Sequence, residues 1–155
     1  MANHIGLSSP VLAPLLPVTG TFALPFTAYF TVLSSRVVYY RLRDQCYLGD
    51  NSSKDTDEEA RQQNELYLAT RCHQNFIENV PLGLMLAAFA ELNGGSRTRL
   101  TYALSALFTF RLLHSEFGLI KGLGLGRPIG YYGTMGTLAW LAGYATYLVK
   151  SYWGF

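Results

Sequence analysis

Two long uncharged stretches dominate this sequence. Residues 1–35 contain no Lys, Arg, Asp or Glu, and residues 128–149 form a second run of 22 residues without a charge. A helix needs about 20 predominantly apolar residues to span a membrane. A secretory signal peptide would start with basic residues, and no Lys or Arg precedes Arg36. We therefore expect transmembrane helices over about 15–40 and 128–150.

Composition agrees with a membrane protein. Half of the 155 residues are hydrophobic and only 14% are charged, whereas soluble domains carry about 25% charged residues. The apolar content argues against a disordered chain, and a net charge of +2 offers no basic stripe for a nucleic acid. Cys46 and Cys72 cannot form a disulfide framework, and no metal-ligand spacing accompanies them. We expect one integral membrane domain over residues 1–155, without metal or nucleic acid.

The middle of the chain holds two shorter uncharged runs, 79–90 and 100–110. With 1.5 Å of rise per residue, neither run can cross about 30 Å of hydrocarbon alone. Extending them into their polar flanks predicts helices over about 67–92 and 99–119. The fold class expected is therefore an all-α membrane protein, a bundle of four transmembrane helices with a polar loop over 41–65.

Basic residues are unevenly distributed between the two ends of this bundle. Six Lys or Arg residues lie in or beside the first and third loops, against three at the opposite end. Because cytoplasmic loops are enriched in Lys and Arg, the first and third loops are expected to be cytosolic.

Several polar side chains fall inside the predicted spans, at the same cytosolic end. A charged residue in a bilayer costs about 2.5–3.5 kcal/mol on insertion scales, so each requires a partner or a function. On the second helix, Arg71, Asn75 and Glu78 have the spacing of one helix face. The third and fourth helices add Arg111 with His114, and Arg127 with Tyr131.

Arginines exceed acids in this region. Arg36, Arg71, Arg111 and Arg127 face only Glu78 and Glu116 at comparable depth. Guanidinium groups bind carboxylates in a bidentate manner, so the excess favours an anionic ligand with carboxylates. The alternative is that these groups only bridge helices. In the same way, Tyr131 could belong to an interfacial aromatic belt, and His114 could hold a neighbouring helix rather than act as a base.

The segment Arg71–Leu82 resembles the second-helix signature of the MAPEG family, the membrane-associated proteins in eicosanoid and glutathione metabolism. Four further segments match in the same order, and the resemblance covers roughly residues 20–150. They are Gly49-Asp50, Glu91-Leu92-Asn93-Gly94, Arg111-Leu112-Leu113-His114 and Arg127-Pro128-Ile129-Gly130-Tyr131.

The resemblance implies a homotrimer in the endoplasmic reticulum membrane that binds glutathione between subunits near the cytosolic face. It implies that Arg127 stabilises the glutathione thiolate. Pro128 has no hydroxyl to donate a hydrogen bond to the thiolate, and we expect the nearby phenol of Tyr131 to donate one instead. Prostaglandin-isomerising members have a serine where this chain has Pro128, so the chain looks more similar to the microbial and fungal branch and to microsomal glutathione transferases. The implied glutathione ligands are Arg36, Arg71, Asn75, Glu78, Arg111 and His114.

Three functions are compatible with these residues. The first is a glutathione-dependent transferase, peroxidase or isomerase acting on a lipophilic electrophile. The second is a non-catalytic lipid-binding or scaffold protein of the same family. The third is a proton-coupled transporter that uses Glu78 and His114 as a relay.

Overall fold

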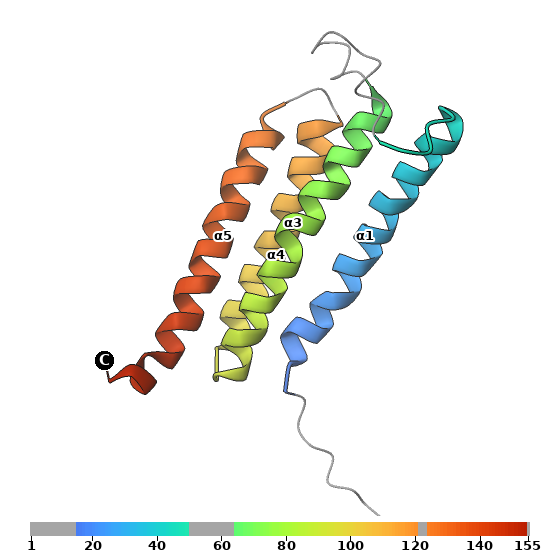
Figure 1. Cartoon of the computed structure of the whole chain (residues 1–155). Helices are drawn as coiled ribbons and strands as arrows, with labels where there is room; N and C mark the ends of the chain where they lie inside the picture. Colours follow the sequence, from blue (N-terminus) through green and yellow to red (C-terminus); the bar gives the residue numbers. More distant parts are fainter. Residues whose placement is uncertain (1–14, 50–63, 121–123, 155) are drawn as a thin grey trace, which may run out of the picture.

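The computed structural model describes residues 15–49, 64–120 and 124–154. This part of the chain forms four long helices that run alternately up and down (Figure 1). A π-helical segment, η1, continues α4, and a short 3-10 turn, η2, follows α5. Their bounds are α1 Pro17–Arg43, α3 Glu65–Leu92, α4 Arg97–Leu112, η1 Leu113–Leu119, α5 Gly126–Val149 and η2 Lys150–Trp153.

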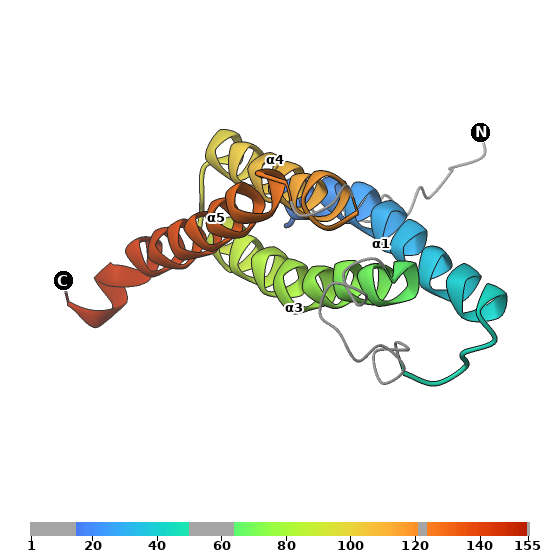
Figure 2. The ribbon, with the colours of Figure 1, turned by 90° about the horizontal axis from the view of Figure 1, so that it is seen from above.

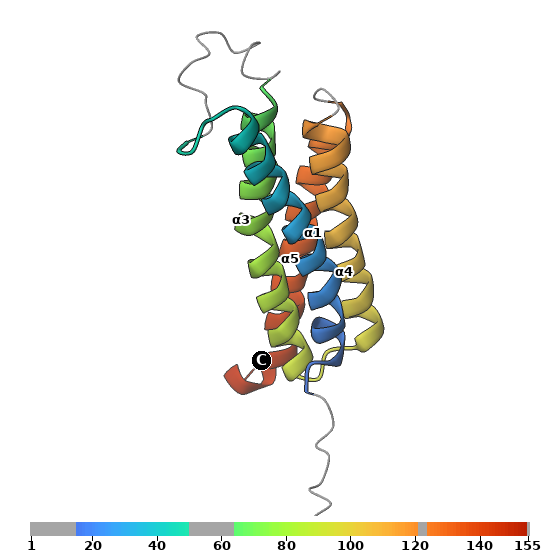
Figure 3. The same ribbon diagram turned by 90° about the vertical axis from the view of Figure 1, so that its right-hand side faces the viewer.

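Helices α3 and α4 each pack against the other three long helices, so they form the middle of the bundle. Helix α1 contacts α3 and α4, whereas α5 contacts α3, α4 and η1 from the other side. The view from above shows α1 and α5 well separated, and the side view shows all helices nearly parallel to one long axis (Figures 2 and 3). The end of α1 and the starts of α3 and α5 therefore lie at one end of the bundle, which we call the upper end, as in Figure 1.

Capping residues fix two of the helix starts. Pro17 occupies the first turn of α1, where a missing N–H is harmless. The buried carboxylate of Glu91, at the end of α3, accepts hydrogen bonds from the backbone N–H groups of Val18 (2.7 Å) and Thr19 (2.9 Å). Since a helix start has unpaired N–H groups and a partial positive charge, Glu91 caps α1 and ties it to α3. The side-chain oxygen of Asn64 accepts a hydrogen bond from the backbone N–H of Tyr67 (3.1 Å) and caps the start of α3.

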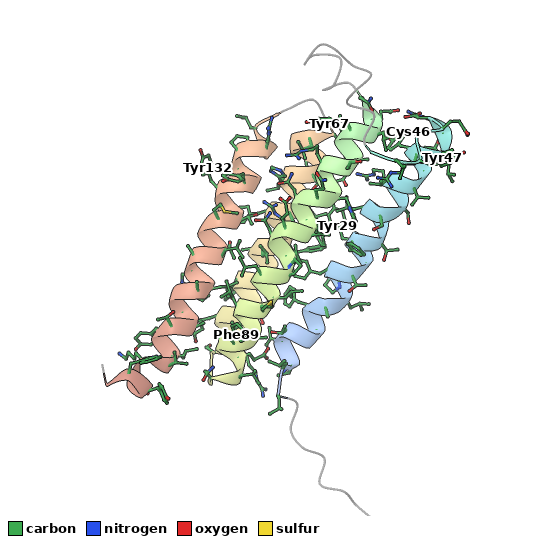
Figure 4. The ribbon with its side chains drawn as sticks, in the orientation of Figure 1. Tyr29, Cys46, Tyr47, Tyr67, Phe89 and Tyr132 are labelled. Atoms are coloured by element: carbon green, nitrogen blue, oxygen red, sulfur yellow. The ribbon has the colours of Figure 1, made fainter. Side chains whose placement is uncertain are left out.

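The interior of the bundle contains leucines, small residues and an aromatic cluster. Phe26 and Tyr29 of α1 meet Phe76 of α3 and Phe108 of α4 with ring centroids 5.3–6.2 Å apart. Figure 4 labels Tyr29 in this region, and Phe89 farther down α3. This apolar cluster joins the three helices below the more polar upper end.

The prediction of an all-helical fold with four long helices is confirmed for the described residues, which contain no strand. The helix expected over 99–119 is α-helical only to Leu112 and then continues as η1. Of the polar loop expected over 41–65, residues 50–63 lie outside the described part. No helix among the described residues is both long and apolar enough to qualify as a membrane span. The transmembrane placement stays a prediction.

Candidate functional site

A polar cavity of about 400 Å³ opens at the upper end of the bundle, between α3, η1 and α5. Its size falls within the range of about 300–1,000 Å³ that is common for small-molecule sites. Figure 4 labels Tyr132 on the outer side of α5 near this end. The lining residues are Arg71, Asn75, His114, Leu119, Arg127, Pro128, Tyr131 and Tyr132.

The lining of the polar cavity is cationic. Arg71 donates a hydrogen bond to the Gln74 side chain (3.2 Å), on its own helix. Among the described residues, neither Arg71 nor Arg127 forms an ion pair, and no Asp or Glu lines the cavity. Two guanidinium groups from α3 and α5 therefore border one space with no protein carboxylate between them. An anion with carboxylate groups complements such a space.

His114 joins η1 to the start of α5. Its Nδ1 lies 3.1 Å from the backbone carbonyl of Arg127. A carbonyl oxygen can only accept, so Nδ1 carries the proton and donates it. In the neutral ring, Nε2 then has the free lone pair. This hydrogen bond holds the imidazole in one orientation and fixes the backbone from which the Arg127 side chain projects.

Glycines allow η1 and α5 to approach closely. A Cβ atom at Gly130 would lie 2.6 Å from the Cβ of His114 and 2.7 Å from its backbone nitrogen. A Cβ at Gly118 would lie 2.6 Å from the backbone nitrogen of Arg127. Real Cβ atoms essentially never make contacts shorter than 3.0 Å. The absence of side chains at Gly118 and Gly130 is therefore what brings His114 and Arg127 to the same cavity.

Arg111 lies behind the cavity and does not line it. Its side chain is buried, with 1% of the residue exposed, and it donates to the backbone carbonyls of Gly130 (3.0 Å) and Asn75 (3.4 Å). No carboxylate pairs with it among the described residues. Arg111 thus links the α3 wall of the cavity to the α5 wall. Its role in this geometry is to hold both walls, since Asn75 itself lines the cavity.

Arg36 and Glu78 also lie outside the polar cavity. Arg36 forms an ion pair with Glu116 of η1 (3.1 Å), and Glu116 also accepts a hydrogen bond from Tyr29 (3.0 Å). Arg36 lines a separate cavity of about 260 Å³ instead. Glu78 is exposed on α3 and has no ion pair among the described residues.

The structure therefore brings together five of the eight residues that the sequence singled out, namely Arg71, Asn75, His114, Arg127 and Tyr131. Leu119 and Tyr132 also line the cavity without having been singled out for binding. Tyr132 directly follows Tyr131, but nothing in the spacing of either residue distinguishes a cavity wall from the outer surface. The Arg36–Glu116 pair joins residues 80 positions apart, so no local pattern could have indicated it.

The chain matches a known protein family. The sequence model of the MAPEG family matches residues 19–147, which is most of the chain. Searches of curated proteins and of solved structures found no match.

Proposed function

The chain belongs to the MAPEG family, and we propose that it is a glutathione-dependent membrane enzyme that activates the glutathione thiol against a lipophilic electrophile. The observation that carries this proposal is the polar cavity, in which Arg71 and Arg127 face a common space without a carboxylate partner among the described residues. Transfer, peroxide reduction and isomerisation all require the same activated thiol.

The cavity fits the charges of glutathione. This tripeptide carries two carboxylates and one ammonium group, so it needs cationic donors and one acidic acceptor. Arg71 supplies a donor for a carboxylate, and Asn75 supplies an amide one turn away on the same helix. Glu78 lies on the same face of α3 as Arg71 and Asn75, one turn beyond Asn75. We assign Glu78 to the ammonium group, as the resemblance to the family implies.

Arg127 would act on the sulfur. A thiol has a pKa near 8.5, and a guanidinium group close to it favours the anionic, nucleophilic form. Each unit by which the pKa falls corresponds to about 1.4 kcal/mol. Tyr131 lies one turn after Arg127 on α5, and both side chains line the cavity. Its phenol would donate a second hydrogen bond to the thiolate. Catalysis then combines thiol activation with proximity of the two reactants.

The outer surface supports a membrane location. Large apolar side chains are exposed on all four long helices, and a lipid environment would cover them. Examples with at least half of the residue exposed are Leu24, Met85, Tyr102 and Ile129. A membrane around these helices would also concentrate an apolar electrophile beside the cavity. We further propose that the protein is a homotrimer in the endoplasmic reticulum membrane, with the upper end of the bundle towards the cytosol. In the trimer, a neighbouring subunit would complete the binding site beside the exposed Glu78.

Calorimetric titration of glutathione into the protein in nanodiscs tests this function. We expect binding to the wild type, and about 10- to 150-fold weaker binding to Arg71→Gln, because a charge-assisted hydrogen bond contributes about 1.5–3 kcal/mol. Arg97→Gln is the matched control, since Arg97 is exposed at the lower end of the bundle. Absence of binding to the wild type at millimolar glutathione would refute the proposal and favour the non-catalytic scaffold role.

A further inference from the structure

A second cavity, the apolar groove, runs along the outside of α4 and α5. Its volume is about 530 Å³, larger than that of the polar cavity. Its lining includes small residues, Ala103 and Ala106 of α4 and Gly133 and Gly136 of α5, and the ring of Phe110 packs directly over Gly133. The remaining lining residues are Arg99, Tyr102, Phe110, Thr137 and Trp140.

The groove has the length and shape of a single hydrocarbon chain. Arg99 and Phe110 lie at its two ends on α4, 11 residues apart, which corresponds to about 16 Å at 1.5 Å per residue. A Cβ at Gly136 would meet no atom within 4 Å, so the lining at this position faces open space. The polar hydroxyl of Thr137 donates to the carbonyl of Gly133 (2.8 Å) and is already satisfied. A narrow, elongated apolar ligand therefore suits the groove.

One charged residue marks the lower end of this groove. Among the described residues that line it, Arg99 is the only charged one, and it has no ion pair with any described residue. Its guanidinium carbon lies 5.7 Å from the ring centroid of Tyr144, which stacks on Trp140 (5.0 Å between centroids, 24° between planes). The Tyr144 hydroxyl accepts a hydrogen bond from the backbone N–H of Ser96 (2.8 Å).

This arrangement prepares Arg99 to bind an anion. The Tyr144–Trp140 pair is fixed to the α3–α4 turn through the hydrogen bond with Ser96. Because the Arg99 guanidinium already rests over the Tyr144 ring, it loses less conformational freedom on binding a ligand than a fully mobile side chain would. No carboxylate competes for the guanidinium group among the described residues. A cation at one end of an apolar channel complements a molecule with one acidic group and one hydrocarbon chain.

We propose that the apolar groove binds a single-chain anionic amphiphile, with its hydrocarbon chain between α4 and α5 and its acidic group on Arg99. This site is separate from the polar cavity, and the proposal does not depend on glutathione. Ordinary bilayer lipid would also touch this face, but it would not discriminate between an acidic and a neutral head group. The distinguishing property is therefore selectivity for the anion.

Quenching of Trp140 fluorescence by dibromostearate tests the proposal directly, because bromine quenches only at short range. The chain has two tryptophans, so a Trp153→Phe background isolates the Trp140 signal. In nanodiscs at neutral pH, we expect saturable quenching by dibromostearate that unbrominated stearate reverses. Dibromostearyl alcohol, which has the same chain without the charge, should bind about tenfold more weakly.

Two pairs of variants test whether binding requires Arg99 and the open space of the groove. Arg99→Gln should weaken dibromostearate binding about tenfold, whereas Arg97→Gln, two residues earlier and outside the lining, should not. Gly136→Leu should fill the groove and abolish saturable quenching. Gly143→Leu is its match, because Gly143 is also on α5 with open space around a Cβ but outside the groove. Equal quenching by acid and alcohol, or unchanged quenching in Arg99→Gln and Gly136→Leu, would overturn the proposal.

Discussion

The contact between α5 and η1 allows a quantitative test at Gly130. An alanine at this position would place its Cβ 2.6–2.7 Å from the Cβ and backbone nitrogen of His114 and from the carbonyl oxygen of Phe110. Two of these three atoms belong to the backbone, so a rotamer change cannot relieve the overlap and the helices must move apart. Overpacking of this kind costs about 1–3 kcal/mol, while replacing glycine in a helix regains about 0.5–1 kcal/mol.

Gly143→Ala on the same helix is the matched control, because a Cβ at Gly143 meets nothing within 4 Å. It should stabilise the protein by about 0.5–1 kcal/mol. We expect the two variants to differ by about 2 kcal/mol, or about 4–8 °C in Tm for a chain of this size. Thermal unfolding in detergent measures the difference.

Gly130→Ala should also weaken glutathione binding, since the displaced helices carry His114 and Arg127. Calorimetry on both variants measures that effect. If Gly130→Ala matched Gly143→Ala in Tm and in glutathione affinity, the close contact between α5 and η1 and its role in shaping the cavity would be refuted.

Three further experiments test the contacts that hold the bundle and the site. Glu91→Gln keeps one acceptor but removes the negative charge at the start of α1, and should cost about 1–2 kcal/mol in thermal unfolding; an unchanged Tm would contradict the cap. In a double-mutant cycle, Arg36→Gln and Glu116→Gln should show a coupling of roughly 0.5–1 kcal/mol in the free energy of unfolding, because the ion pair is partly exposed. Strictly additive effects of the two substitutions would argue against the ion pair. Gly118→Ala, whose Cβ would press on the Arg127 backbone, should lower both Tm and glutathione affinity, and a variant as stable as the wild type would place η1 farther from α5.

Much of the fold could be predicted from the pattern of charges. The uncharged runs predict four helices, and when η1 is counted with α4 the predicted ends differ from the observed ones by at most three residues. Helical spacing likewise placed Arg71 and Asn75 on one face, and both line the cavity. These features are local, because each depends on residues within a few turns of one another.

The remaining features depend on contacts between distant residues. Spacing placed Arg111 and His114 on one stripe, but it could not indicate that Arg111 is buried behind the cavity while His114 lines it. The change to a π-helix after Leu112 shifts the register of η1, and Glu116 then pairs with Arg36 of α1. That pairing removes Arg36 from the group of unpaired arginines that the sequence suggested.

A pH titration of the glutathione thiolate tests the central claim most directly. With the protein saturated by glutathione, the ultraviolet absorbance of the thiolate reports the fraction ionised at each pH. We predict a midpoint at least one pH unit below the value of about 8.5 for a free thiol, and a return towards that value in Arg127→Gln. A midpoint equal to that of free glutathione, or one that Arg127→Gln leaves unchanged, would contradict the assignment of Arg127 and of this cavity to thiol activation.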